Sequence, residues 1–418
     1  MWELNSYKGI PVTEAERSAK LKAGIACLMV MTAVATVFMT QSIFLEISTS
    51  FHIDISRARF AFSVTSLCYS AAFFFIGPLA DRFNPPKMAI TGLLALSVMI
   101  FCAASTTRFP LFITAMGLTG FSAALIPASM FPHMTMLAPK EKLGIYVGAI
   151  VASGTLGIVL GRVAMGVLTA QFGWPFAFRV VSALLVILAT MGAFFLIEKR
   201  AHRHPPTRGI AELYLRSIKL VTSPRPLALL ATGFFLFFGF LGMVTFLTYR
   251  LVAPPFHFTS GEVGWISLAG ITALIAPFAG NLSQKTGPFK VSIPGLALCI
   301  IATQLMGWFQ SVPVITLGLL LLFAGAYCCQ PLIFLLIGQC VPRESLGSAS
   351  SLYILVCIGG GSLSSMVLGP IWTSYGWTGV TLACTASLAM ATTVLGMLAN
   401  HTADADKTQE KNMEQQVG

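Results

Sequence analysis

Long apolar stretches alternate with short polar ones along nearly the whole chain. Each apolar stretch is long enough to cross a bilayer, which takes a helix of about 20 residues. Backbone polar groups in lipid must be hydrogen-bonded within their own segment, which favours helices. The sequence therefore predicts twelve transmembrane helices, at residues 23–45, 58–80, 88–105, 110–137, 144–170, 176–197, 226–249, 262–283, 289–309, 313–339, 347–372 and 378–399.

The longest internal polar stretch divides the chain into two halves. It covers residues 198–225, follows the sixth apolar run and is rich in basic residues, so we predict a cytoplasmic linker. Six-helix bundles are expected at 23–197 and 226–399. The N-terminal segment 1–22 and the tail 400–418 are polar and expected on the cytoplasmic side, the tail without fixed structure.

Composition excludes most other classes of protein. Apolar residues make up 56% of the chain and charged residues 10%, against roughly a quarter charged in soluble domains. The net charge of +11 does not indicate nucleic-acid binding, because 20 of the 26 Lys and Arg residues fall on segments predicted to be cytoplasmic. By the positive-inside rule we expect a multi-pass protein of a bacterial inner membrane with both termini cytoplasmic.

Motifs of soluble chemistry are absent from the sequence. It has no P-loop, no H-E-x-x-H and no G-x-S-x-G elbow, so we predict that the protein is not an enzyme. The nine cysteines all lie in apolar stretches without metal-ligand spacing. No metal and no cofactor is expected.

The two halves align with each other at a constant offset of 203 residues, in two separate places. Residues 77–87 lie over 280–290. Further on, eight residues recur in the second half as Pro342, Glu344, Leu346, Gly347, Gly360, Gly369, Gly376 and Trp377; their counterparts are Pro139, Glu141, Leu143, Gly144, Gly157, Gly166, Gly173 and Trp174. Two parallel six-helix halves with a site between them near mid-membrane characterise one large class of secondary transporters.

The segment between the second and third apolar runs resembles the G-x-L-a-D-R-x-G-R-K loop of the major facilitator superfamily. It matches at Gly77, Leu79, Ala80, Asp81 and Arg82, and departs from it at Asn84, Pro85 and Pro86. The resemblance extends over nearly the whole chain and implies an all-α fold of two six-helix repeats. It also implies that Gly77, Asp81, Arg82 and Lys87 form a conformational latch at the inner side.

Glycines in the fifth apolar run are similar to the G-x8-G-x3-G-P-x2-G-G motif of the antiporter branch of that family. Spacing of this kind permits close helix packing. The chain departs from the motif at Arg162, where the family has proline, and at Met165. The resemblance favours the exporter-like drug/proton antiporter branch. The matching glycines are Gly148, Gly157, Gly161 and Gly166.

Arg162 is the one Lys or Arg well inside a predicted span. An intramembrane charge is costly and marks a functional candidate, and a guanidinium can hold a carboxylate bidentately. Arg162 therefore either binds a substrate anion or pairs structurally with Glu46 near the outer end of the first helix. Glu46 is also the candidate carrier of a coupling proton or ion.

Four further polar residues lie within spans, namely Gln41, Tyr69, Gln304 and Gln330. Gln41, Tyr69 and Gln330 are candidates for substrate contact, whereas the resemblance places Gln304 on a helix that the family usually keeps peripheral. We predict a monomeric secondary transporter that moves a small organic solute through the lipid bilayer by alternating access. Export of lipophilic compounds is the leading hypothesis, and transport of an organic anion held by Arg162 is the alternative. A membrane sensor that transports nothing is the third.

Overall fold

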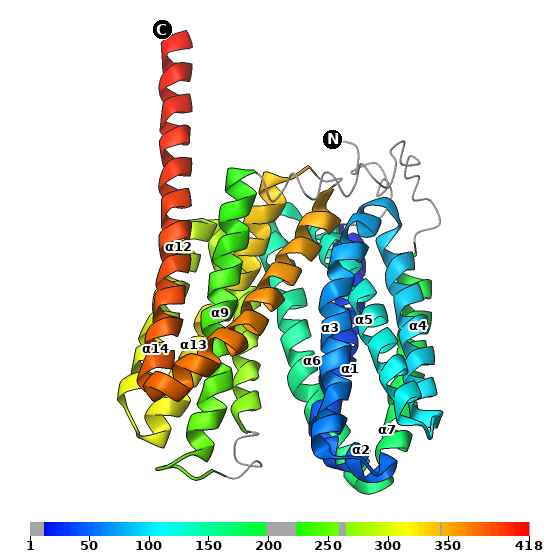
Figure 1. Ribbon diagram of the computed structural model, residues 1–418. Helices are drawn as coiled ribbons and strands as arrows, with labels where there is room; N and C mark the ends of the chain where they lie inside the picture. The colour runs from blue at the N-terminus through cyan, green and yellow to red at the C-terminus, as the bar shows by residue number, and fades with distance from the viewer. Residues whose placement is uncertain (1–11, 198–222, 259–264, 343–344, 418) are drawn as a thin grey trace. The chain divides into compact units, whose positions relative to one another are not determined.

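The computed structural model describes residues 12–197, 223–258, 265–342 and 345–417, which form helices joined by short turns (Figure 1). The elements are α1 (Val12–Phe38), η1 (Met39–Ser42), α2 (Phe44–Phe51), α3 (Ile55–Arg82), α4 (Pro85–Ser105), α5 (Phe109–Leu137), η2 (Lys140–Lys142), α6 (Leu143–Phe172), α7 (Trp174–Phe195), α9 (Pro224–Val252), η3 (Trp265–Ile275), α11 (Ala276–Thr286), α12 (Pro288–Trp308), α13 (Val312–Cys340) and α14 (Leu346–Val417). The η elements are 3₁₀ helices.

The chain folds as two compact units, unit 1 (Met1–Gly209) and unit 2 (Ile210–Gly418). The division falls in the stretch 198–225 for which the sequence predicts a linker, and residues 198–222 of that stretch lie outside the described part. In unit 1, α1 packs against α6, and α5 packs against both α3 and α4. In unit 2, α9 packs against α14, and α12 packs against both α13 and α14.

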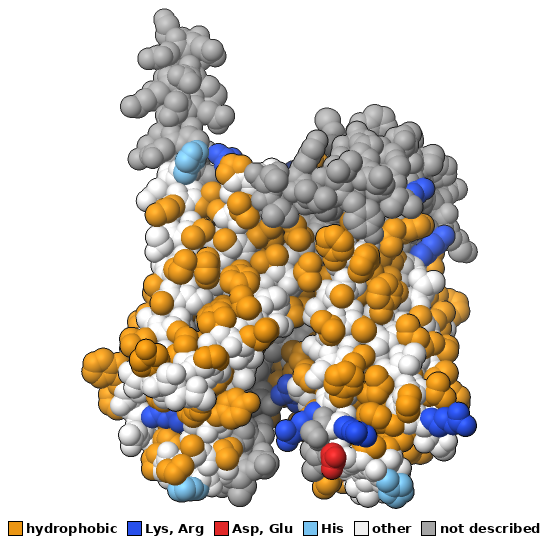
Figure 2. All heavy atoms as spheres, in the orientation of Figure 1, with side chains coloured by type: hydrophobic (Ala, Val, Ile, Leu, Met, Phe, Trp, Pro, Cys, Tyr) orange, Lys and Arg blue, Asp and Glu red, His pale blue; other side chains and the backbone are white. Residues whose placement is uncertain are grey.

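Where the structure describes them, the twelve predicted runs consist of helices, the first with a break. Among the described residues, ten helices are long and apolar enough to cross a membrane. One of them, α14, contains two of the predicted runs, because Gly376 has the non-helical angles φ 59° and ψ −151° and divides it. The eighth run is formed by η3 and α11 together. Hydrophobic side chains cover the helices in the space-filling view (Figure 2). This is a multi-pass integral membrane protein.

The first run is not one helix, so the prediction of a single helix over 23–45 is wrong. The α-helix ends at Phe38, continues as the 3₁₀ turn η1 and restarts as the separate helix α2. Thr40, Gln41 and Ser42 fall at this break. Ser42 Oγ donates a hydrogen bond to the carbonyl oxygen of Arg162, 2.9 Å away on α6, and this bond joins the break to α6.

The C-terminal tail is also more ordered than expected. Helix α14 continues to Val417, so the expectation of a tail without fixed structure is wrong (Figure 1). The stretch 403–417 is rich in Ala, Lys, Gln and Glu, which are among the strongest helix formers. Because a helix already runs into this stretch, no new nucleation is needed to extend it.

The internal repeat in the sequence corresponds to repeated contacts in the structure. A Cβ atom on Gly157 of α6 would overlap the carbonyl oxygen of Met31 on α1. A Cβ on Gly360 of α14 would overlap the carbonyl oxygen of Phe234 on α9 in the same way. Both members of the second contact lie 203 residues after those of the first. Each unit therefore brings its first and fifth predicted helices together through a glycine at one shared position.

A second pair of contacts follows the same offset. A Cβ on Gly92 of α4 would lie 2.8 Å from Leu125 Cβ on α5. One on Gly295 of α12 would lie 2.7 Å from Cys329 Sγ and 3.2 Å from Cys328 Cβ on α13, and Cys328 is the counterpart of Leu125. The third and fourth predicted helices of each unit thus cross at equivalent glycines.

Candidate functional site

Arg162 lies on α6 beside the break in the first predicted helix. Its guanidinium carbon is 5.7 Å from the centre of the Phe38 ring, the last residue of α1. Its backbone carbonyl accepts the hydrogen bond from Ser42 at the end of η1. One turn before the break, Gly161 and Ala35 hold α6 and α1 so close that a Cβ on the glycine would lie 2.6 Å from that of the alanine.

The depth of Arg162 in the span fits a site for a charged solute. It lies ten residues before Phe172, where α6 ends, and at 1.5 Å per residue this is about 15 Å along the helix. The side chain is half-buried. A charge inside a membrane span is costly and marks a functional candidate. The planar guanidinium offers donors in a fork that matches a carboxylate or phosphate.

An aromatic cluster fixes the end of unit 1 nearest this break. Trp174 Nε1 donates to Ser50 Oγ at 2.9 Å, which ties the start of α7 to α2. Neighbouring rings in the cluster have centroids 5.1 to 6.4 Å apart. The cluster holds α2 and the starts of α5 and α7 together. It therefore fixes the position of α2 after the break. Its members are Phe51, Phe109, Phe112, Trp174 and Phe178.

Glu46 lies in the first turn of α2, on the far side of the break from α1. It is half-exposed, and the salt bridges between described residues do not join it to Arg162. Whether Arg162 binds a substrate anion or has a structural role therefore stays a prediction. A role of Glu46 in coupling stays a prediction.

All four predicted latch residues lie in helices, three in α3 and Lys87 in the first turn of α4. Helix α3 extends through Arg82, so Asp81 and Arg82 occupy its last turn and are half-buried, while Gly77 is buried one turn earlier. The connection to α4 is only Phe83 and Asn84. Asn84 caps α4 by accepting a hydrogen bond from the backbone N–H of Lys87 at 3.2 Å, and the Lys87 side chain is exposed.

The remaining candidates lie in different places. Gln41 is half-buried in η1, one residue from Ser42, and belongs to the Arg162 region. Tyr69 is buried within unit 1 with its ring edge-on to Phe73, 5.0 Å between centroids. Gln330 lies in α13 of unit 2. Its backbone carbonyl oxygen accepts a hydrogen bond from the hydroxyl of Tyr353 at 3.5 Å. Gln41 is the one of the three that lies in the break that Arg162 adjoins.

Three of the motif glycines differ in their contacts. Gly157 and Gly161 lie so close to α1 that a Cβ at either position would overlap Met31 or Ala35. A Cβ on Gly166 would meet Ser42 Cβ at an ordinary 3.9 Å. Gly148 is buried, and its role in packing stays a prediction.

The ion pair between Lys142 and Glu16 was not predicted from the sequence. Lys142 in η2 donates to the Glu16 carboxylate near the start of α1, and Glu16 also pairs with Lys20 at 3.4 Å. The pair joins the start of α1 to the start of α6, at the ends of these helices opposite Arg162. Its members are 126 residues apart, so nothing in the local sequence signals it.

Arg250 of unit 2 lies in the last turn of α9 and is buried, with 8% of its surface exposed. Its Nη1 donates to the Met306 carbonyl at 2.6 Å and its Nη2 to the Phe309 carbonyl at 3.3 Å. Its guanidinium carbon lies 4.6 Å from the Trp377 ring centre, and Trp377 Nε1 donates to the same Met306 carbonyl at 3.0 Å. Arg250 therefore caps the end of α12.

Replacing Arg250 with Met is expected to lower the stability of the protein in detergent by about 3 kcal/mol, the order of two hydrogen bonds to a charged group. Thermal unfolding followed by a thiol-reactive dye measures the change. Trp377→Phe keeps the ring under the guanidinium and loses one hydrogen bond, so it should cost less. Equal melting temperatures for Arg250→Met and the wild type would contradict the capping role.

The structure describes a multi-pass helical membrane protein with a half-buried arginine inside one of its spans. The sequence model of the Major Facilitator Superfamily matches residues 26–364 and 250–416. The chain belongs to this superfamily.

Relatives and solved structures agree with this assignment. The inner membrane transport protein YnfM of Escherichia coli (strain K12) is 26% identical over 377 residues, 89% of this chain and 88% of that protein. The uncharacterized transporter YgaY of Escherichia coli O157:H7 is 28% identical over 84% of this chain and 89% of its own. The human organic anion transporter MFSD10 (TETRAN) has a TM-score of 0.74 at 17% identity, covering 91% of this chain and 99% of its own. FucP in the outward conformation has a TM-score of 0.73 at 15% identity, with the same two coverages. These two structures share the fold.

Proposed function

We propose that the protein is a secondary transporter that carries a small organic anion, with Arg162 as the anchor of the anionic group. Two six-helix repeats alternate access to the site across a bacterial inner membrane, with both termini cytoplasmic, the chain acting as a monomer. The observation that carries the proposal is the position of Arg162, about 15 Å from the end of its helix and beside a break in the first predicted helix.

The surroundings of Arg162 favour a carboxylate-bearing organic molecule over a bare inorganic ion. The Phe38 ring covers one side of the guanidinium and itself contacts Phe62, 5.5 Å between centroids. An aromatic surface beside a cation suits a ligand with an apolar body and one charged group. Gln41 and Ser42 add polar groups at the same break. Glu46 is the proposed carrier of a coupling proton.

Flux measurements in proteoliposomes test this proposal. Vesicles preloaded with a pool of unlabelled carboxylates should take up a labelled carboxylate by exchange, and uptake should fall when Arg162 is replaced by Gln. Uptake of lipophilic cations instead of anions would overturn it, and absence of any flux would favour a sensor.

Export of lipophilic compounds is the second candidate function. It is favoured by the packing of Gly157 and Gly161, two glycines at the spacing of the antiporter motif, against α1. Under this alternative Arg162 is structural, and its replacement would leave the flux of lipophilic cations unchanged.

The half-buried last turn of α3 supports a latch role for Asp81 together with Gly77, Arg82 and Lys87. Asp81→Asn removes one charge with little change in shape and is expected to slow transport severalfold while folding and insertion stay normal. Initial rates in proteoliposomes, normalised to the amount of folded protein, measure the effect. Lys87→Gln, at an exposed position, should have the smaller effect. Full transport by Asp81→Asn would rule out the latch.

A further inference from the structure

The eighth predicted helix begins as a 3₁₀ helix. Its first eleven described residues form η3, which continues without a break into α11 at Ala276. A 3₁₀ helix seldom exceeds three or four residues, and a longer stretch within a helix often marks a functional hinge. The equivalent residues of unit 1, at 62–72, lie within the regular α-helix α3. The two units therefore show the same repeated segment in two helical forms.

The burial of side chains in η3 follows a spacing of three residues. This helix packs against α13, and its buried residues Gly270 and Ala273 are followed at the same spacing by the buried Ala276. Ile271 and Leu274, again three residues apart, are 48% and 47% exposed. A 3₁₀ helix has three residues per turn, so this pattern is the one that its geometry requires.

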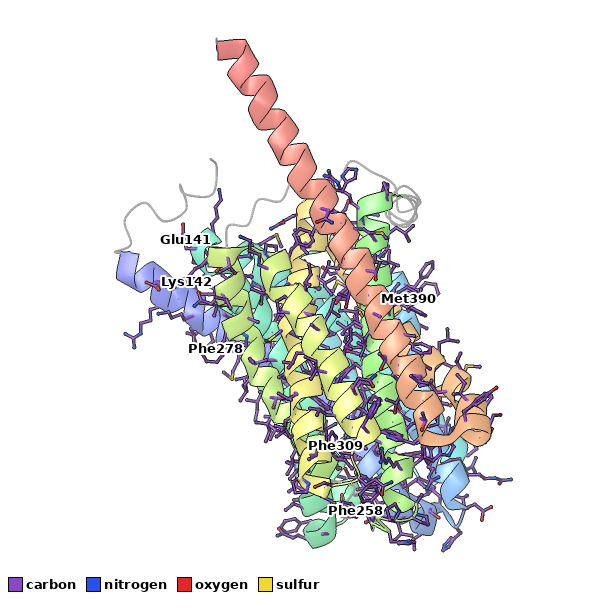
Figure 3. All side chains as sticks on the ribbon, turned by 90° about the vertical axis from the view of Figure 1, so that its left-hand side faces the viewer. Glu141, Lys142, Phe258, Phe278, Phe309 and Met390 are labelled. Atoms are coloured by element: carbon purple, nitrogen blue, oxygen red, sulfur yellow. The ribbon has the colours of Figure 1, made fainter. Side chains whose placement is uncertain are left out.

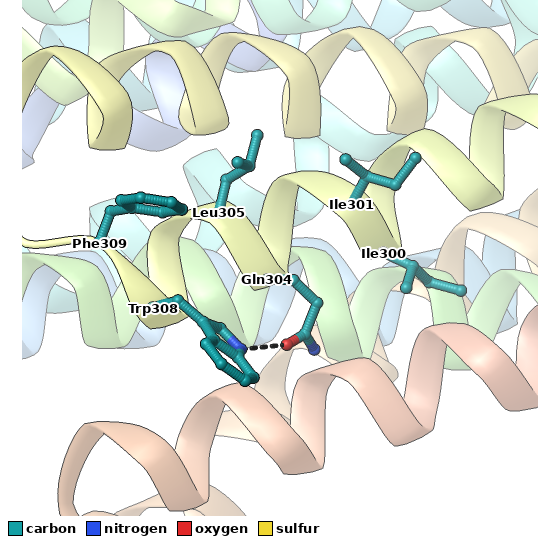
Figure 4. Close-up of a pocket in the computed structure, with 6 residues that line it drawn as sticks. All are labelled: Ile300, Ile301, Gln304, Leu305, Trp308 and Phe309. Atoms are coloured by element: carbon teal, nitrogen blue, oxygen red, sulfur yellow. Dashed lines mark hydrogen bonds between the residues drawn. The ribbon is translucent and has the colours of Figure 1, made fainter.

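The α-helices of unit 2 follow a different spacing. In α11, the exposed large hydrophobic residues Phe278 (Figure 3) and Leu282 are four residues apart. On α12, Ile300, Gln304 and Trp308 form one row with a spacing of four, and Trp308 Nε1 donates to Gln304 Oε1 at 2.9 Å along that row (Figure 4). The change from a spacing of three to a spacing of four thus occurs where η3 joins α11.

Two rows of small residues pass through η3, one for each helical form. Gly270, Ala273 and Ala276 have the spacing of three that aligns residues in a 3₁₀ helix. Ala269, Ala273 and Ala276 have spacings of four and three, which place residues on one face of an α-helix. Ala269 and Gly270 are both buried, and none of the four residues has more than a methyl side chain. The sequence is therefore compatible with close packing against α13 in either form.

Unit 1 holds its segment in the α form through a glycine that unit 2 does not have. A Cβ on Gly120 of α5 would overlap the carbonyl oxygen of Thr65, so this contact fixes α3 against α5. The equivalent of Gly120 in α13 is Phe323, whose ring contacts that of Phe240 on α9, 4.8 Å between centroids. Where α13 approaches a neighbour through glycines, the neighbour is α12. The contact that locks the α form in unit 1 is therefore replaced in unit 2.

We propose that residues 265–275 are a two-state element of this transporter, which changes between a 3₁₀ helix and an α-helix. In the α form the eleven residues are shorter by about 5.5 Å, close to one helical turn. The start of the span then moves toward α11, and Ala269 takes the place of Gly270 against α13. The change moves one end of a span while the rest of unit 2 stays packed. It does not depend on which solute the protein transports.

Distances between two spin labels measure the length of the segment in the full chain. Trp265 at the start of η3 and the exposed Leu282 in α11 are each replaced by a ketone-bearing amino acid that carries the label, so the nine native cysteines stay. The two backbone positions are about 30 Å apart with η3 in the 3₁₀ form and about 25 Å apart with an α-helix throughout. Pulsed EPR in liposomes resolves this difference, and we expect a main distance of about 30 Å in the otherwise unchanged protein.

Unit 1 provides the control pair of labels. Arg57 and Phe74 are both exposed and are separated by the same number of residues within α3. Because α3 is an α-helix over this whole stretch, the control pair should give one distance of about 25 Å under all conditions.

Two neighbouring substitutions separate the two forms. Gly270→Leu adds bulk to the row that contacts α13 in the 3₁₀ form, so the population ratio of the shorter to the longer distance should rise at least about fivefold. Ala269→Leu adds bulk to the row used by the α form, so the longer distance should remain the main one. Gly270→Ala should shift the ratio in the same direction as Gly270→Leu but by less, and it replaces that variant if leucine prevents folding.

Several outcomes would overturn the proposal. A single distance of about 30 Å in the wild type and in every variant would show a fixed 3₁₀ helix, and one of about 25 Å in the wild type would show an ordinary α-helix. Equal shifts in Gly270→Leu and Ala269→Leu would exclude the two rows as the cause. In the exchange assay Gly270→Leu should transport more slowly than the wild type. Full flux by that variant would overturn a role in transport, whereas absence of flux in the wild type would bear only on the proposed solute.

Discussion

Replacement of Arg162 with Gln is expected to abolish the stabilisation of the protein by organic anions. A guanidinium binds a carboxylate through two parallel charge-assisted hydrogen bonds, each worth about 1.5–3 kcal/mol. Glutamine keeps a similar length and a hydrogen-bond donor but has no charge. Binding of the anion should therefore weaken by at least about tenfold, and the rise of the melting temperature at a fixed anion concentration should disappear. A thermal-shift screen of the purified protein against organic anions and lipophilic cations measures this.

Two variants control for effects unrelated to the proposed anchor. Arg162→Lys keeps the charge but loses the planar fork, so it should bind the anion with intermediate strength. Arg179→Gln removes an exposed charge from α7 and should respond to anions like the wild type. If lipophilic cations stabilise the wild type and Arg162→Gln equally, and anions stabilise neither, then Arg162 is structural and export of lipophilic compounds is the better proposal.

The sequence predicted the helices well because each depends on a local property, a run of apolar side chains long enough to cross the membrane. The repeat offset also pointed to Gly157 and Gly360, but it pointed equally to Gly166 and Gly369, which make no close contact. The sequence did not predict what Gly157 and Gly360 contact. These two glycines contact the backbone carbonyls of Met31 and Phe234. Because every residue has a backbone carbonyl, the sequence does not show which ones are contacted.

The break at η1 is a feature that the sequence could not reveal. No glycine or proline lies between Ala35 and Glu46, and these are the residues by which breaks are usually recognised. The break is stabilised by the hydrogen bond between Ser42 and Arg162, which are 120 residues apart. Likewise, Arg250 lies near a helix end, and from the sequence alone one would expect its side chain to be exposed. Trp377 and the end of α12 bury it in the fold. Partners this distant in the chain decide whether an arginine in a membrane protein is available to a substrate.

Gly157→Ala and Gly360→Ala are expected to destabilise the protein strongly. A Cβ at either position would overlap a backbone carbonyl oxygen on the first predicted helix of its unit, Met31 in one case and Phe234 in the other. A backbone oxygen cannot rotate away as a side chain can, so the two helices must move apart along their whole contact. Overpacking of this kind costs about 1–3 kcal/mol. Thermal unfolding in detergent measures the loss, and the two variants should lose similar amounts because the contacts are equivalent.

The helices that contain Gly157 and Gly360, α6 and α14, also contain the matched controls. Gly166 and Gly369 are related by the same offset of 203 residues, and a Cβ on Gly166 would meet Ser42 only at 3.9 Å, while one on Gly369 would meet nothing within 4 Å. Alanine in a helix interior is favoured over glycine by about 0.5–1 kcal/mol, so Gly166→Ala and Gly369→Ala should leave the melting temperature unchanged or raise it. The sign of the effect thus separates close helix contact from intrinsic helix propensity. If all four substitutions shifted the melting temperature in one direction, the close contact of the first and fifth predicted helices could not be what requires glycine.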